Sequence, residues 1–356
     1  MAPRPMAPRP MAPRPRAQRP KAQRRGASNP GILVRIAAVA SSLALAASGA
    51  SAQITAYFGI PYTDKLPSDP TYAESVFDIF YPDGGCPAYP GCPSPLRPVA
   101  VALRGGNSNS LYSGAEQVSP IGFQLLQKGF VVVVPAMHVI DMPAGESWIH
   151  TTKDAARVVQ FLRHYATTLN VDPHRVFVQG HSAGGVHSLF LAYNVDFQDP
   201  SSPDPVARES SRPDFVVPWG APSEFACLDP AGVGGLAAPS WASLYLFGVD
   251  DFTLVSLQTK IELSPKTWLL SPALYGRVYT PPAAMVYDLG HQHPCGQIAD
   301  VHDGKFGPIL LEALTRYCTL YGDPGPCSES ILLNGTGDLE GAISLLVAWM
   351  AEKARV

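Results

Sequence analysis

The chain has 356 residues, of which 46% are hydrophobic and 15% are charged, enough apolar material for one core in a domain of about 250–300 residues. Residues 1–52 hold nine of the 26 basic residues and none of the 29 acidic ones, so the remainder has 17 basic against 29 acidic residues, or −12. This balance argues against nucleic-acid binding, and no apolar run after residue 52 is long enough to span a membrane.

The N-terminus carries two segments that do not belong to a folded core. Residues 1–30 repeat the pentad MAPRP three times and contain eight basic residues and no acid, which predicts a disordered Pro/Arg-rich segment. Residues 31–52 contain a short apolar stretch followed by Ala50-Ser51-Ala52, the pattern of a signal peptide cleaved before Gln53. A membrane anchor is the weaker alternative because the stretch is short. We therefore expect a secreted or periplasmic protein whose mature domain is 53–356.

Strand-like and helix-like runs alternate through the mature domain. The expected strands are 75–81, 99–103, 130–136, 175–180, 213–220, 283–289 and 329–334. The expected helices are 121–129, 151–169, 184–193, 306–317 and 339–353. Continuous apolar strands between amphipathic helices predict an α/β fold, a mainly parallel, doubly wound sheet with helices on both faces. Residues 221–280 look irregular and aromatic-rich, which suggests a lid-like insertion.

Six cysteines lie in the mature domain, and an even number in an exported chain favours disulfides over metal ligation. The short loops Cys86–Cys92 and Cys318–Cys327 are the favoured pairs, which leaves Cys227 with Cys295. No Cys/His spacing resembles a zinc site. We expect neither a metal nor another cofactor.

Ser182 lies in the motif Gly180-His181-Ser182-Ala183-Gly184, which fits G-x-S-x-G between a strand and a helix. A tight turn of this kind lifts the serine oxygen above the sheet, and glycines flank it because side chains there would collide with neighbouring backbone. The N-terminus of the following helix favours a developing negative charge. The motif predicts a nucleophile, although the same pattern can also occur in an ordinary strand-to-helix turn.

Three stretches carry a resemblance to a known family: NVDPHRVFVQGHSAGGVHSLFLAY, DAARVVQFLRHYA before it and SPALYGRVYTPPAAMVYD after it. They resemble the α/β-hydrolase superfamily, in particular its esterase/lipase branch with acetyl and feruloyl esterase-like enzymes. The resemblance implies an oxyanion hole built from the N–H of Ala183 and from a glycine turn after the strand at 99–103. Here that turn is Arg104-Gly105-Gly106, with arginine in place of the usual histidine.

The resemblance also implies a catalytic acid after the strand at 283–289. Asp288, Asp300 and Asp303 are the candidates. The phrase ADVHDGKFG fits the family pattern best, so Asp300 is the preferred acid.

The general base departs from the family pattern. The loop after the last strand, where the resemblance places a histidine, contains Asp338 instead, and no histidine follows His302. A triad is defined by the roles of its members and not by their order in the chain, so His291, His293 or His302 can serve instead. We rank His291 and His293 first, because the loop GHQHPC is bounded by glycine and proline and adjoins a cysteine. A metal held by His291 and His293 is a weaker interpretation.

Two functions remain open at this point. The first is a secreted serine hydrolase that cleaves small-molecule or polymer-linked carboxylic esters through a Ser182 acyl-enzyme, with its oxyanion held at Ala183 and Gly106. The alternative is a catalytically impaired protein of the same fold that acts as an extracellular binding module. In the first case an acyl pocket or lid is expected from the aromatic residues Trp241, Tyr245, Phe247, Phe252 and Trp268.

Overall fold

The computed structural model describes residues 40–44, 53–64, 75–82, 95–106, 120–138, 148–228, 254–277 and 279–356. The predicted disordered segment 1–30, the Cys86–Cys92 pair and the aromatic residues between 241 and 252 lie outside the described residues.

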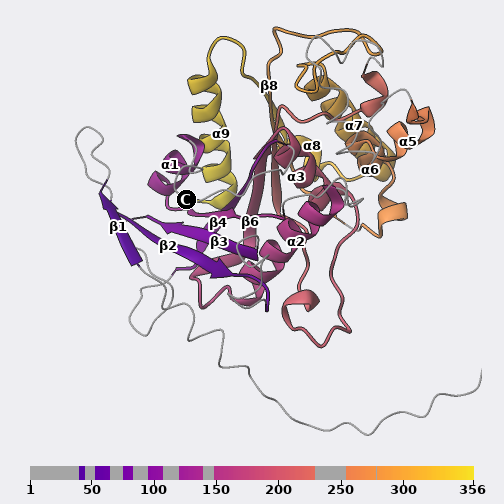
Figure 1. Cartoon of the computed structure of the whole chain (residues 1–356). Helices are drawn as coiled ribbons and strands as arrows, with labels where there is room; N and C mark the ends of the chain where they lie inside the picture. The colour runs from indigo at the N-terminus through magenta and orange to yellow at the C-terminus, as the bar shows by residue number, and fades with distance from the viewer. Residues whose placement is uncertain are drawn as a thin grey trace, which may run out of the picture. The chain divides into compact units, whose positions relative to one another are not determined.

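The described strands form one sheet in the order β1-β2-β3-β5-β4-β6-β7-β8-β9 (Figure 1). Pairing is antiparallel from β1 to β5 and parallel from β5 through β4 to β9. The strands are β1 (Ala40–Ala44), β2 (Gln53–Pro61), β3 (Val76–Tyr81), β4 (Arg97–Leu103), β5 (Val131–Pro135), β6 (Val171–His181), β7 (Phe215–Trp219), β8 (Ala284–Tyr287) and β9 (Ile331–Asn334).

Helices cover both faces of this sheet, as expected for continuous apolar strands. One apolar cluster joins the sheet to α1 and α9, and two others join the opposite face to α2, α3, α6 and α7. The α-helices are α1 (Pro120–Gln127), α2 (Trp148–His164), α3 (Ala183–Tyr193), α5 (Leu257–Glu262), α6 (Pro265–Leu270), α7 (Phe306–Tyr321), α8 (Gly325–Glu329) and α9 (Leu339–Ala354). Short 3₁₀ helices are η4 (Val206–Arg208), η5 (Phe225–Cys227) and η7 (Pro272–Tyr275).

The seven strands and five helices expected from the sequence are all present, with ends shifted by a few residues. The sequence reasoning missed β2, which pairs antiparallel with β1 on one side and with β3 on the other. It also missed α5 and α6 inside the segment taken as irregular. Trp268 of α6 was expected in a lid or acyl pocket, but it is 1% exposed and stacks on Trp148 in the core. This expectation was wrong for Trp268, because α6 packs as a core helix.

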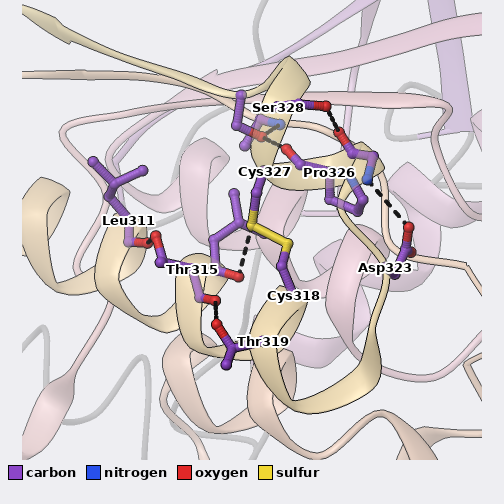
Figure 2. The surroundings of a disulfide bond; sticks show 12 residues. Leu311, Thr315, Cys318, Thr319, Asp323, Pro326, Cys327 and Ser328 are labelled. Atoms are coloured by element: carbon purple, nitrogen blue, oxygen red, sulfur yellow. Dashed lines mark hydrogen bonds between the residues drawn. A yellow bond between two sulfur atoms is a disulfide. The ribbon is translucent and has the colours of Figure 1, made fainter.

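Two of the expected disulfides are present. Cys318 at the end of α7 is bonded to Cys327 in α8, which holds the short helix against the longer one (Figure 2). Cys227 at the end of η5 is bonded to Cys295 in the loop after β8. The second bond ties together two segments that are 68 residues apart in the sequence.

Candidate active site

Ser182 occupies the turn between β6 and α3, at the carboxyl edge of the parallel strands. Its backbone has φ 56° and ψ −119°, a conformation that a residue with a side chain rarely adopts. Its N–H donates to the carbonyl of Trp219, and its own carbonyl accepts from Val186 in the first turn of α3. The surrounding hydrogen bonds therefore hold a strained serine at the start of a helix, which is the geometry that G-x-S-x-G predicts.

The glycines around Ser182 are required by close backbone contacts. A Cβ at Gly180 would lie 2.3 Å from the carbonyl carbon of Gly184, and a Cβ at Gly184 would lie 2.4 Å from the carbonyl oxygen of Leu103. Both separations are shorter than any carbon contact in a packed protein. The turn can approach β4 this closely only because both positions lack side chains.

His302 is the imidazole that contacts Ser182. Its Nε2 lies 2.8 Å from the Ser182 Oγ. Its Nδ1 lies 3.1 Å from Oδ1 of Asp300, and the same carboxylate oxygen accepts from the His302 backbone N–H at 2.9 Å. With Nδ1–H donating to Asp300, Nε2 is left as an acceptor for the serine hydroxyl. The hydrogen bond to His302 keeps the pKa of Asp300 below its ordinary value.

His181 supports the His302 ring from one side. The two rings are stacked, with centroids 5.2 Å apart and planes 7° from parallel. Burial, together with the nearby His302, lowers the pKa of His181, which favours its neutral form beside the His302 ring. Gly220, with φ 52°, passes close to both rings, and a Cβ there would lie 3.4 Å from His181 and 3.8 Å from His302.

The ranking of the histidines needs correction, because His291 and His293 have other partners. The Nδ1 of His291 lies 2.7 Å from Asp288, on an exposed part of the loop. The Nδ1 of His293 lies 2.5 Å from Asp303. Both acids thus pair with histidines other than the one at Ser182. Asp300, the preferred acid, is the carboxylate beside His302, the histidine that contacts Ser182.

Asp338 does not face the serine, although it stands where the resemblance places a histidine. It is the N-cap of α9, and its carboxylate accepts from the N–H of Gly341 at 2.8 Å. An aspartate is among the best residues for this capping role.

The loop that carries Asp300 and His302 is fixed at several points. Asp303 is 4% exposed and accepts from the N–H of Lys305 as well as from His293. Gly304 donates to the His291 carbonyl, and a Cβ at Gly304 would lie 1.8 Å from the carbonyl oxygen of Asp288. The Cys227–Cys295 bond anchors the same loop to η5. His302 is therefore carried on a loop after β8 that hydrogen bonds, a close glycine contact and a disulfide hold in place.

The glycine turn after β4 lies against Ser182. A Cβ at Gly105 would lie 2.9 Å from the carbonyl oxygen of His181 and 3.4 Å from the Cβ of Ser182. Gly106 has φ 84°, which favours glycine. The candidate oxyanion donors Gly105, Gly106 and Ala183 thus come from two segments that meet at the serine.

Sequence reasoning singled out Ser182, Asp300 and the glycine turn as candidates, and the structure brings them together, but it ranked the histidine that contacts Ser182 last. A signal for it exists in Asp300-Val301-His302. An aspartate side chain commonly accepts from the backbone N–H two residues later, which brings residue i+2 back toward the carboxylate. This local turn lets one short segment present both a carboxylate and an imidazole beside Ser182.

Among the described residues, no group of three or more His, Cys, Asp or Glu side chains is arranged to hold a metal ion. Across the same residues, no helix combines the length and the apolar character needed to cross a membrane.

The sequence of this chain matches the model of one known protein family. Residues 89–262 match the model of the BD-FAE family, an α/β-hydrolase esterase family. No curated protein matches the chain.

Solved structures share the fold at low sequence identity. A truncated carbohydrate esterase from gut microbiota matches with a TM-score of 0.58 and 15% identity, over 85% of this chain and 96% of that one. An acetyl ester-xyloside bifunctional hydrolase from Caldicellulosiruptor lactoaceticus matches with a TM-score of 0.54 and 19% identity, over 82% and 95%. A bifunctional GH43-CE protein from Bacteroides eggerthii matches with a TM-score of 0.57 and 21% identity, over 84% of this chain and 38% of that one. At these identities the likeness establishes the fold.

Proposed function

From the premise that this chain is an α/β-hydrolase of the esterase type, we propose that it cleaves carboxylic esters through an acyl-enzyme on Ser182, with His302 as general base and Asp300 as the acid that orients it. The chemistry needs no metal and no other cofactor, because the serine, the imidazole and backbone N–H groups supply the nucleophile, the proton transfer and the charge stabilisation.

The first half of the reaction forms the acyl-enzyme. His302 Nε2 accepts the Ser182 proton as Oγ attacks the ester carbonyl carbon. The carbonyl oxygen becomes an oxyanion and is stabilised by N–H groups of Ala183 and of the turn at Gly105 and Gly106. The imidazolium then gives its proton to the departing alkoxide, and the carbonyl reforms as the C–O bond breaks. Asp300 stabilises the imidazolium throughout.

The second half returns the enzyme to its starting state. His302 takes a proton from a water molecule, whose oxygen attacks the acyl carbon. The tetrahedral intermediate collapses, Ser182 Oγ recovers the proton from His302, and a carboxylic acid leaves. Each proton that His302 accepts is given back in the same half-reaction, so the enzyme is unchanged after one turnover.

The single observation that carries this proposal is the 2.8 Å separation between His302 Nε2 and Ser182 Oγ. It falls within the range in which a base activates a nucleophile. The alternative of an impaired binding module drew its support from the histidine missing after β9. That support is gone, since the loop after β8 supplies an imidazole at the serine.

The proposed site of action is outside the cytoplasm. The signal-like segment 31–52 and the disulfides Cys227–Cys295 and Cys318–Cys327 support this, because structural disulfides persist in oxidising compartments. The proposed substrates are small-molecule or polymer-linked esters.

The test is hydrolysis of 4-nitrophenyl acetate by the purified chain, beside Ser182→Ala and His302→Ala. We expect turnover by the native protein and a loss of about 10²–10⁴-fold or more in either variant. Equal rates in all three proteins would show that the hydrolysis is not catalysed at this site, and the proposal would fall.

A further inference from the structure

A cavity of about 260 Å³ lies between the sheet and α1, beside the glycine turn. Its floor is one row of side chains across the carboxyl ends of the parallel strands: Ala102 of β4 is the register partner of Gln179 of β6, which is paired in turn with Val217 of β7. Ile121 of α1 covers the row. The cavity is a little smaller than a typical site for a whole ligand and has room for one ring-sized group.

Gln179 is an unusual residue for this position. It is 5% exposed, and it lies two residues after Phe177, which packs on Trp349 of α9 on the same face of the sheet. Buried parallel strands are normally apolar at such positions. Among the described residues, no hydrogen-bond partner accompanies the Gln179 side-chain amide, which borders the cavity.

An amide that borders a cavity in an otherwise apolar row, with no hydrogen-bond partner among the described residues, is not explained by packing alone. Gln160 is a buried glutamine with a structural role, and its side-chain amide can be compared with that of Gln179. The Gln160 amide nitrogen lies within hydrogen-bond distance of three backbone carbonyls, those of Phe197, Ala207 and Glu209. Gln179 lacks such partners and faces open space instead.

The cavity begins next to the nucleophile. Gly105 lines it, and a Cβ at Gly105 would lie only 3.4 Å from the Cβ of Ser182. The close packing of Gly105 against His181 and Ser182 places this wall of the cavity directly beside the nucleophile. His181, which backs the His302 ring, forms another part of the wall.

We propose that this cavity is a substrate subsite that receives a hydroxyl-bearing group of the ester, with the Gln179 amide as the residue that recognises the hydroxyl. An amide both donates and accepts, which matches the donor and acceptor character of a hydroxyl. The described lining contains no acidic residue, and Arg104 is its one charged residue. This inference rests on the proposed esterase function and adds a specificity-determining residue to it.

The kinetic test compares esters that differ only by a hydroxyl. The acyl side is probed with methyl phenylacetate and its three ring-hydroxylated isomers, and the alcohol side with phenethyl acetate and its three ring-hydroxylated isomers. The native protein should prefer at least one hydroxylated isomer by about tenfold in kcat/KM. Gln179→Leu should reduce that preference to near unity, mainly through KM. Gln160→Leu, the same change at a buried glutamine outside the cavity, should keep the preference.

A second measurement does not depend on the choice of ester. Thermal unfolding without ligand should give Gln179→Leu a Tm equal to or above that of the native protein, because the change breaks no hydrogen bond to a described residue and places an apolar group in an apolar row. Gln160→Leu should lower the Tm because it breaks hydrogen bonds. Ala102→Leu, which fills the cavity floor, should lower kcat/KM for the ring-bearing esters relative to ethyl acetate.

The outcomes of these experiments distinguish a failure of the subsite proposal from a failure of the proposed esterase function. A native protein that hydrolyses the esters without preferring any hydroxylated isomer overturns the subsite and leaves the esterase intact. A preference that survives in Gln179→Leu, or a Tm loss in Gln179→Leu as large as in Gln160→Leu, overturns the role of Gln179. A native protein that hydrolyses 4-nitrophenyl acetate but none of these esters also overturns the subsite, and one that hydrolyses neither contradicts the proposed function itself.

Discussion

At the scale of single residues, the chemistry of the site depends on which histidine contacts the serine. His302 stands 2.8 Å from Ser182, whereas His291 is held on Asp288 at an exposed position. We expect His302→Ala to lower kcat by about 10²–10⁴-fold, since the serine loses its base. His291→Ala, the matched control, should stay within a few-fold of the native rate. Steady-state hydrolysis of 4-nitrophenyl acetate measures both, and the reverse pattern would restore the ranking favoured from the sequence.

A second residue-scale prediction concerns pH and stability. His187 in α3 is fully buried against Trp148, with Nδ1 2.7 Å from the Thr152 hydroxyl, and burial together with the Arg104 charge lowers its pKa to about 3. The unfolded chain takes up a proton at this histidine near pH 6.5, and the folded chain does not. The contribution of neutral His187 to stability is therefore fully present above about pH 6.5. It is lost as pH falls toward 3, by up to about 1.4 kcal/mol per pH unit.

Urea unfolding at pH 7, 6, 5 and 4.5 measures this slope. The free energy of unfolding of His187→Gln, whose new side chain does not titrate, should fall less steeply as pH is lowered than that of the native protein. Parallel declines in the two proteins would show that other groups account for the acid sensitivity.

At the scale of elements, the β6–α3 turn and the β4 end fit together only because of glycine. We expect Gly184→Ala to lower the free energy of unfolding by about 1–3 kcal/mol, because its Cβ would lie 2.4 Å from the Leu103 carbonyl oxygen. Gly335→Ala is the control: the nearest atom to its added Cβ would be 3.6 Å away, and the change should stay within about 0.5 kcal/mol. Equal effects of the two substitutions on chemical unfolding would mean that the turn tolerates a side chain.

The Cys227–Cys295 bond should matter for both stability and catalysis. It closes a loop of 68 residues, against nine for Cys318–Cys327, so the chain-entropy model predicts losses of about 4 and about 3 kcal/mol when each pair is changed to serine. Since Cys295 lies on the loop that carries His302, only the Cys227→Ser/Cys295→Ser variant should also lose kcat. Kinetics and urea unfolding of both double variants check this. Equal kcat values in the two variants would separate the bond from the catalytic loop.

The sequence predicts the elements that leave a local pattern of apolar residues, and it does not predict contacts between segments that are distant in the chain. β5 and α2 were found because continuous apolar runs and helical periodicity are local patterns. β2 was missed because its pairing with β3 brings together two segments that are separated in the chain, and no local pattern records that pairing. The His302 contact was missed for a related reason: the path of the loop after β8 depends on the Asp300 turn, the Asp303 contacts and the Cys295 bond acting together.

At the scale of the whole molecule, the N-terminal strand raises a question about processing. β1 pairs with β2 at the sheet edge, yet it lies inside the predicted signal peptide 31–52. If cleavage occurs before Gln53, β1 is removed and β2 becomes the edge strand. We expect a chain that begins at Gln53 to fold with nearly the same Tm as the full chain and to keep its activity, because β2 remains paired with β3.

N-terminal sequencing of the protein exported by its producing cell checks the cleavage, with Gln53 as the expected first residue. A mature protein that retains residues 40–44 would contradict the predicted signal peptide and make β1 part of the working fold.

The central claim is that Ser182 is a nucleophile activated by His302, and covalent labelling tests it without any choice of substrate. A fluorophosphonate is applied to the purified native chain, to Ser182→Ala and to His302→Ala, and intact mass is recorded over time. We predict one adduct on the native protein, none on Ser182→Ala, and labelling at least about 10²-fold slower on His302→Ala. A folded native protein that gains no adduct, or one labelled as fast without His302 as with it, would contradict the account.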